Sequence, residues 1–221
     1  LPCKNVIVNL GKADGILSEN EQVKGEEFEP TERIKVYILE VKDTPKGPRI
    51  LLSRTHPGLV KRLFESEVAE VKDGTVEIKS IAREAGSRTK IAVWSNDPDV
   101  DPVGACVGMN GARVNSIVEE LRGEKIDIIN WDENPAILIE NALSPAKVIA
   151  VMADPDEKTA LVVVPDYQLS LAIGKEGQNA RLAARLTGFK IDIKSETQAR
   201  ESGELYDYDD EDEYYDEEEY S

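Results

Sequence analysis

The chain has 221 residues, of which 40% are hydrophobic and 5% aromatic, and its formal net charge is −17 at pH 7. This length and this aliphatic composition favour two or three small α+β modules over a large all-β sandwich. No segment is apolar over the roughly 18 residues that cross a membrane, and the two cysteines lack the spacing of a disulfide framework or a metal site, so we expect a soluble, cytoplasmic protein.

The negative charge is concentrated at the C-terminal end. Residues 201–221 contain twelve acidic and no basic side chains, so residues 1–200 carry 27 basic groups against the remaining 32 acidic groups. Because this end repels itself and offers few aliphatic groups to bury, we expect a disordered acidic tail. Such a tail would serve as a solvating extension, or as a nucleic-acid mimic that competes for basic surfaces of the same chain.

Residues 1–54 are predicted to form an incomplete β domain of the OB type. The chain begins at Leu1 without an initiator Met or a signal-peptide pattern, and we expect the natural N-terminus to lie upstream. Short strand patterns occupy residues 6–8, 15–17, 34–41 and 49–52, and TPKGP at 44–48 predicts a hairpin turn. Four strands predict an open, partial barrel, since an OB-type barrel needs five.

Two further stretches share the element order α-β-β-α-α-β. In residues 55–130 we expect a helix at 57–65, strands at 75–83 and 89–94, a short helix from 102, a helix through 121 and a strand at 125–129. In residues 131–200 we expect a helix at 135–143, strands at 147–152 and 160–164, a short helix near 169, a helix through 186 and a strand at 190–194. The linker at 130–135 is short, so the two copies should pack side by side as one rigid body.

Each copy carries a Gly-x-x-Gly loop between its two inner helices, at 108–111 and 174–177, and each loop is followed by Gly-x-Lys-Ile-Asp-Ile. The repeat therefore supports one module present twice. Glycines allow a sharp bend and close approach of a phosphate chain, and the loop abuts a helix N-terminus that attracts anions. This is the arrangement of a type II KH module, which clamps about four nucleotides; the alternative is a pair of structural helix-turn-helix units.

The candidate RNA-binding residues are the two loops and the polar side chains on the helices that follow them. They are Gly108, Met109, Asn110, Gly111 and Arg113 in the first copy, and Gly174, Lys175, Glu176, Gly177, Asn179, Arg181 and Arg185 in the second. Because Lys175 lies inside the second loop whereas the centre of the first loop is uncharged, we expect the second loop to hold the RNA backbone more strongly. The basic side chains on the helices are alternatively an ordinary solvated face.

Longer motifs resemble the NusA family of transcription termination/antitermination factors. Residues 101–108 read DPVGACVG and are followed by GARV at 111–114, which is similar to the first KH module of that family; residues 168–184 read QLSLAIGKEGQNARLAA and resemble the second. LSRTHPG at 52–58 resembles the junction between its OB-type S1 domain and its KH pair.

The resemblance covers roughly residues 5–200 and implies a factor that rides on RNA polymerase, contacts the emerging transcript and modulates pausing, termination and antitermination. The family's N-terminal polymerase-binding domain and its first barrel strand have no counterpart in this sequence.

No catalytic constellation accompanies these motifs. His56 is the one histidine and precedes a proline at an expected helix start, and Asp97, Asp99 and Asp101 lie in a loop where turn formation explains them. We therefore expect no enzyme activity, cofactor or metal, and a monomer that binds single-stranded RNA. The alternatives are a KH-type protein–protein adaptor and a ribosome-associated module, although a ribosomal protein would usually be strongly basic.

Overall fold

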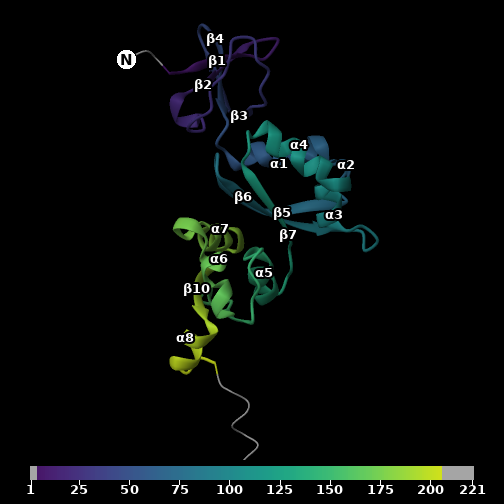
Figure 1. Ribbon diagram of the computed structural model, residues 1–221. Helices are drawn as coiled ribbons and strands as arrows, with labels where there is room; N and C mark the ends of the chain where they lie inside the picture. The colour runs from purple at the N-terminus through teal and green to yellow at the C-terminus, as the bar shows by residue number, and fades with distance from the viewer. Residues whose placement is uncertain (1–3, 206–221) are drawn as a thin grey trace, which may run out of the picture.

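The computed structural model describes residues 4–205, which form three consecutive parts stacked in chain order (Figure 1). The architecture is α+β, as predicted, with one four-stranded sheet followed by two sheets of three strands each. None of the helices in the described part of the chain is long and apolar enough to span a membrane.

The N-terminal part is an open sheet with strand order β1-β2-β4-β3. Its elements are β1 (Val6–Asn9), β2 (Asp14–Leu17), η1 (Glu19–Glu21), β3 (Tyr37–Thr44) and β4 (Gly47–Ser53). The strand expected from residue 34 begins at Tyr37 instead, because Lys35 is used elsewhere: its N–H donates to Glu120 and its carbonyl accepts from Arg54. The sheet has two free edges and does not close into a barrel.

The first α-β-β-α-α-β unit, called the first unit, runs from α1 to β7. It contains α1 (Pro57–Glu67), α2 (Ala69–Lys72), β5 (Val76–Glu84), β6 (Arg88–Ser95), α3 (Pro102–Val107), α4 (Ala112–Glu120) and β7 (Lys125–Asn130). Helix α1 starts as the sequence predicts: Pro57 occupies its first turn and the Nδ1 atom of His56 accepts a hydrogen bond from the backbone of Gly58. The short helix α2 was not predicted.

The second unit runs from α5 to β10. It contains α5 (Pro135–Ala142), β8 (Ala150–Asp154), β9 (Thr159–Val164), η3 (Asp166–Gln168), α6 (Leu169–Ile173), α7 (Gln178–Thr187) and β10 (Lys190–Ser195). In both units one strand pair is antiparallel (β5–β6, β8–β9) and the other is parallel (β6–β7, β9–β10). The repeat found in the sequence is therefore also a repeat of topology.

The chain after β10 continues into an unpredicted helix, α8 (Glu196–Glu201). Ser195 and Gln198 form a capping box at its start. The expected acidic tail began at Glu201, which is instead the last helical residue, and Glu204 is held by an ion pair of 2.7 Å to Lys194. The rest of that expected tail, residues 206–221, lies outside the described residues.

The two units are packed against each other, as their short linker predicts: one hydrophobic cluster extends across both units, while a second cluster, which includes Leu59, Phe64 and Ile117, lies within the first unit. Helix α7 of the second unit packs on β5 and β6 of the first, and buried residues from both units form one cluster, among them Ala82, Ala92, Ile129, Leu182 and Ala183.

A buried ammonium group also joins the two units. The Nζ atom of Lys90 donates to Asp127 at 2.9 Å and to the carbonyl of Ser144 in the second unit at 2.7 Å. Burial lowers the pKa of Lys90, and the nearby carboxylate of Asp127 opposes that shift. The relative placement of the two units is thus fixed by both apolar packing and a polar contact.

A buried arginine ties the N-terminal sheet to the first unit. Arg54 is 1% exposed; its guanidinium contacts Glu26 at 2.9 Å and Glu120 of α4 at 3.0 Å. The guanidinium groups of Arg54 and Arg122 both lie over the ring of Phe28.

Candidate nucleic-acid interface

The two Gly-x-x-Gly loops have the same backbone conformation. Gly108 has φ 79° and ψ 172°, and Gly174 has φ 79° and ψ 170°. The third residues, Asn110 and Glu176, are left-handed at φ 54° and φ 56°, and the last glycines have φ 75° in both copies. Loops with unrelated central residues thus fold identically, so the glycine positions determine their shape.

The first glycine of each loop is required by packing inside the protein. A Cβ atom at Gly174 would lie 2.7 Å from the backbone nitrogen of Asn179, and one at Gly108 would lie 2.7 Å from Cγ of Arg113. The last glycine of the second loop has open space instead, because a Cβ at Gly177 would meet nothing nearer than 3.9 Å. The first glycine closes the loop onto the outgoing helix, and the last leaves a bare surface.

The centres of both loops lie on the surface, where a ligand can reach them. Met109 is 85% exposed, and Asn110, Lys175 and Glu176 are also exposed. Each loop is a single 3-10 turn, η2 (Met109–Gly111) or η4 (Lys175–Gly177), that leads directly into α4 or α7. The first amides of such a helix lack intrahelical acceptors and carry partial positive charge, so each loop can hold an anion.

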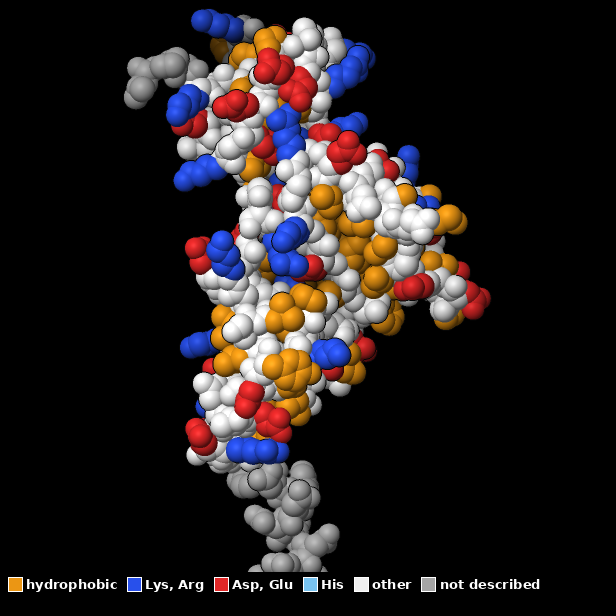
Figure 2. Space-filling model, viewed as in Figure 1, with side chains coloured by type: hydrophobic (Ala, Val, Ile, Leu, Met, Phe, Trp, Pro, Cys, Tyr) orange, Lys and Arg blue, Asp and Glu red, His pale blue; other side chains and the backbone are white. Residues whose placement is uncertain are grey.

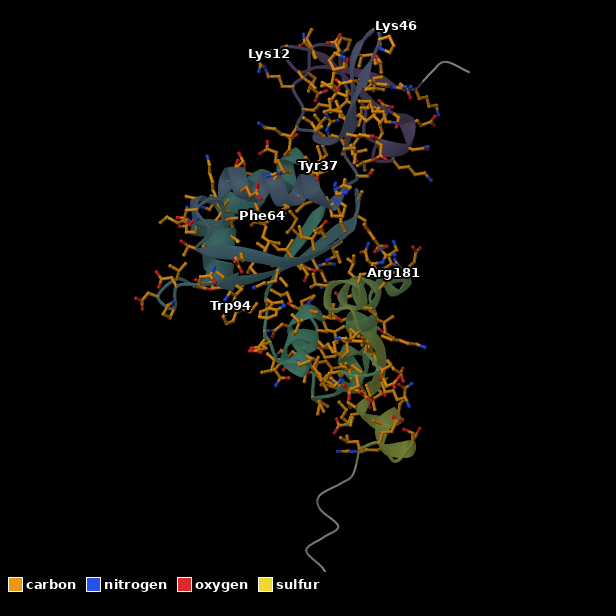
Figure 3. All side chains as sticks on the ribbon, turned by 180° about the vertical axis from the view of Figure 1, so that it is seen from behind. Lys12, Tyr37, Lys46, Phe64, Trp94 and Arg181 are labelled. Carbon is orange, nitrogen blue, oxygen red and sulfur yellow. The ribbon has the colours of Figure 1, made fainter. Side chains whose placement is uncertain are left out.

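Two of the predicted arginines are already engaged within the protein. Arg113 forms an ion pair of 2.7 Å with Glu70 of α2 and donates to the carbonyl of Ala105. Arg181 contacts Glu84 of β5 in the first unit and donates to the carbonyl of Glu176 at 3.0 Å, and Figure 3 shows it where the two units meet. Both arginines therefore support the loops, and their charges are largely balanced before any ligand arrives.

Asn179 is a structural residue and not an exposed ligand. It is 4% exposed, and its Nδ2 donates to the carbonyls of Leu143 and Ala172 at 3.0 Å each. This amide holds α5, α6 and α7 together beneath the second loop. The sequence placed Asn179 on the helix face next to the loop but gave no sign of its burial.

The remaining cations of the second loop are available. Lys175 and Arg185 are exposed, and neither side chain forms a hydrogen bond or an ion pair with any residue in the 4–205 range. The second copy therefore presents the cations Lys175 and Arg185 beside the carboxylate of Glu176, whereas the first copy presents an uncharged tip.

Apolar surface lies beside the loops. Leu171 and Ile173 of α6 are 45% and 38% exposed, and Figure 2 shows hydrophobic side chains gathered on the face that the two units share. A groove of about 550 Å³ between the units is lined by Val103, Ile128 and Val148 together with polar groups. The exposed apolar side chains of α6, which directly precede the second loop, suit bases attached to a phosphate backbone.

A second groove, of about 320 Å³, opens at the second loop itself. It is lined by Arg88 and Lys125 of the first unit and by Gly174, Lys175 and Gln178 of the second. The sequence assigned Lys125 only to a strand, because no local signal reports that the start of β7 faces the other unit. Within residues 4–205, no group of three or more His, Cys, Asp or Glu side chains is arranged to hold a metal.

Models of known domain families match the two units, and known proteins match most of the chain. The model of the NusA-like first KH domain matches residues 54–131, and that of the NusA-like second KH domain matches residues 135–201. The transcription termination/antitermination protein NusA of Bacillus subtilis (strain 168) is 64% identical over 200 residues, which cover 90% of this chain and 54% of that protein.

Two other curated relatives carry the same name. NusA of Halalkalibacterium halodurans is 61% identical over 202 residues, which cover 91% of this chain and 53% of the relative. NusA of Mycobacterium tuberculosis (strain H37Rv) is 53% identical over 196 residues, which cover 86% and 56%. The chain thus spans about half the length of the curated relatives it matches.

Proposed function

This chain belongs to the NusA family, and on that premise we propose that it binds single-stranded RNA through its two Gly-x-x-Gly loops as part of a transcription elongation factor. In that role it contacts the nascent transcript and modulates pausing, termination and antitermination by RNA polymerase. The observation that carries the proposal is the pair of exposed loops with one backbone conformation, each opening a helix.

The chemistry of the loops supports a nucleotide backbone as the ligand. Phosphates are recognised by helix-start amides and by unpaired cations, and the second loop offers both, with Lys175 in it and Arg185 on the helix after it. Bases would occupy the apolar surface beside the loops, as in other KH modules. We expect low sequence specificity and strong salt dependence, because backbone contacts are ionic.

Further parts of the proposal rest on the family alone. We propose that the open sheet β1–β4 is a partial OB-type domain within residues 1–54, followed by KH domains at 55–130 and 131–200. We also propose that the chain is a cytoplasmic, non-catalytic monomer whose protein partner is RNA polymerase.

The test is a titration of fluorescent single-stranded RNA with the wild type and with a Gly111→Asp, Gly177→Asp double variant. The new carboxylate at position 177 would stand at a bare surface, and the one at position 111 would lie against the side chain of Asn115. Both would repel a phosphate, so affinity should fall at least about tenfold. The matched control is Gly74→Asp with Gly188→Asp, since those glycines also have positive φ and open space around a Cβ. Equal affinities for the two double variants would refute RNA binding by the loops.

The rival role is a KH-type adaptor that binds only protein. The ion pair between Arg113 and Glu70 favours this adaptor role for the first copy, because the first loop then has no unpaired cation beside it in the described part of the chain. Under this reading the wild type would show no salt-sensitive RNA binding in the same titration.

A further inference from the structure

The first unit places an unpaired basic side chain beside the loop of the second unit and, within residues 4–205, none beside its own loop. At the first loop the tip is Met109–Asn110 and the nearby Arg113 is paired with Glu70. At the second loop, by contrast, the groove between the units brings Lys125 at the start of β7 next to Gly174 and Lys175.

Both lysines of this groove are exposed, and neither has a hydrogen-bond or ion-pair partner for its side chain within residues 4–205. Arg88, which also lines the groove, differs: its guanidinium makes two bonds to Asp127, at 2.8 and 3.0 Å. Two unpaired ammonium groups from different units therefore line one groove together with Gly174, the first glycine of the second loop.

The contact that forms this groove is fixed and not incidental. The Nε2 atom of Gln178, the first residue of α7, donates to the hydroxyl of Ser87 at 2.7 Å. The carbonyl of Ser87 in turn accepts from the backbone of Lys125 at 3.0 Å. The start of the loop helix is thus linked through a single residue to the strand start that bears the lysine, which holds Lys125 at the second loop.

We propose that Lys125 of the first unit and Lys175 of the second together hold one backbone phosphate of a single-stranded RNA at the second Gly-x-x-Gly loop. This phosphate site is composite and depends on the packing of the two units. The inference rests on the function proposed above and adds a binding residue, Lys125, that the loop motif does not include.

The test compares Lys125→Gln, Lys175→Gln and their double variant in the full chain, using a fluorescent uridine octamer at several salt concentrations. Each single change should weaken binding about fivefold, the size of one exposed ionic contact. Because one phosphate contributes about 0.7 to the slope of log affinity against log salt, the double variant should reduce that slope by about 0.7 and each single variant by less. The double variant should lose less than the product of the two single losses, because both groups hold the same phosphate.

Two control variants separate the possible failures. Lys46→Gln removes the same charge from an exposed lysine at the far end of the molecule (Figure 3), and Lys125→Arg, which keeps the charge, should bind nearly as the wild type does. If Lys125→Gln behaves like Lys46→Gln while Gly177→Asp still loses binding, the composite site is wrong and the proposed function stands. If Gly177→Asp also binds as the wild type does, the RNA-binding function fails and the composite site with it.

Discussion

The two glycines of the second loop should respond differently to the same substitution by alanine. Gly174 has φ 79° and ψ 170°, a region that is essentially restricted to glycine and costs another residue about 1–3 kcal/mol. Its new Cβ would also lie 2.7 Å from a backbone nitrogen of α7, and overpacking of this kind costs about 1–3 kcal/mol more. Gly174→Ala should therefore lower the free energy of unfolding by about 2–6 kcal/mol.

Gly177→Ala tests only the backbone strain. Its φ of 75° and ψ of 11° are left-handed helical, which costs about 1–2 kcal/mol, and the nearest atom to a new Cβ is 3.9 Å away. In urea denaturation followed by circular dichroism, Gly174→Ala should unfold at a lower midpoint than Gly177→Ala, by about 1 M for a difference of about 2 kcal/mol.

The same comparison can be made in the first loop as an internal replicate. A Cβ at Gly108 would lie 3.0 Å from the backbone nitrogen of Arg113, whereas one at Gly111 would meet only the side chain of Asn115, at 3.1 Å. Gly108→Ala should thus again be the more damaging change. Equal midpoints within both pairs would show that the loops relax freely, and the argument that packing determines their shape would be refuted.

Three other measurements test the structure away from the loops. Arg54→Met should lower the stability of the N-terminal sheet by about 3–5 kcal/mol, because it leaves Glu26, itself largely buried, without its partner; limited proteolysis should then cut this sheet first. Hydrogen bonds from Thr197 hold the pKa of Asp166 in the folded protein below its usual value. This carboxylate therefore stabilises the fold at any pH above the pKa that Asp166 has in the unfolded chain. That stabilisation is lost as the pH falls through the lower pKa of the folded state. The amide resonance of Thr197 should titrate below about pH 3.9, and Asp166→Asn should abolish that titration. Burial raises the pKa of the Cys106 thiol to about 11, so in a chain whose other cysteine is replaced by serine, iodoacetamide at pH 8 should modify it only after unfolding.

The order of the elements in the two units was predictable because its signals are local. Glycine pairs, proline at helix starts and runs of β-branched residues each act within a few positions of the chain. The start of β3 was misplaced because Lys35, just before it, is hydrogen-bonded to Arg54 and Glu120, which are distant in sequence. Only the fold shows such partners.

The roles of the basic side chains were harder to predict for the same reason. Arg113 and Glu70 are 43 positions apart, and Arg181 and Glu84 are 97 apart, so no sequence window shows that these arginines are paired. Lys125 is the converse case: it belongs to the repeated Gly-x-Lys-Ile-Asp-Ile motif, yet its place beside the second loop follows from the packing of α7 on the first sheet.

The repeat and its asymmetry together suggest how one strand would be held. Two loops of one backbone conformation offer the same geometry to a phosphate chain, but the unpaired lysines gather at only one of them. Ionic contacts weaken with salt, whereas stacking and apolar contacts weaken much less. The salt dependence of binding an RNA strand that spans both units would therefore come mostly from the second loop. At the uncharged tip of the first loop, Met109 and Asn110, the strand would be bound by backbone amides and apolar contacts.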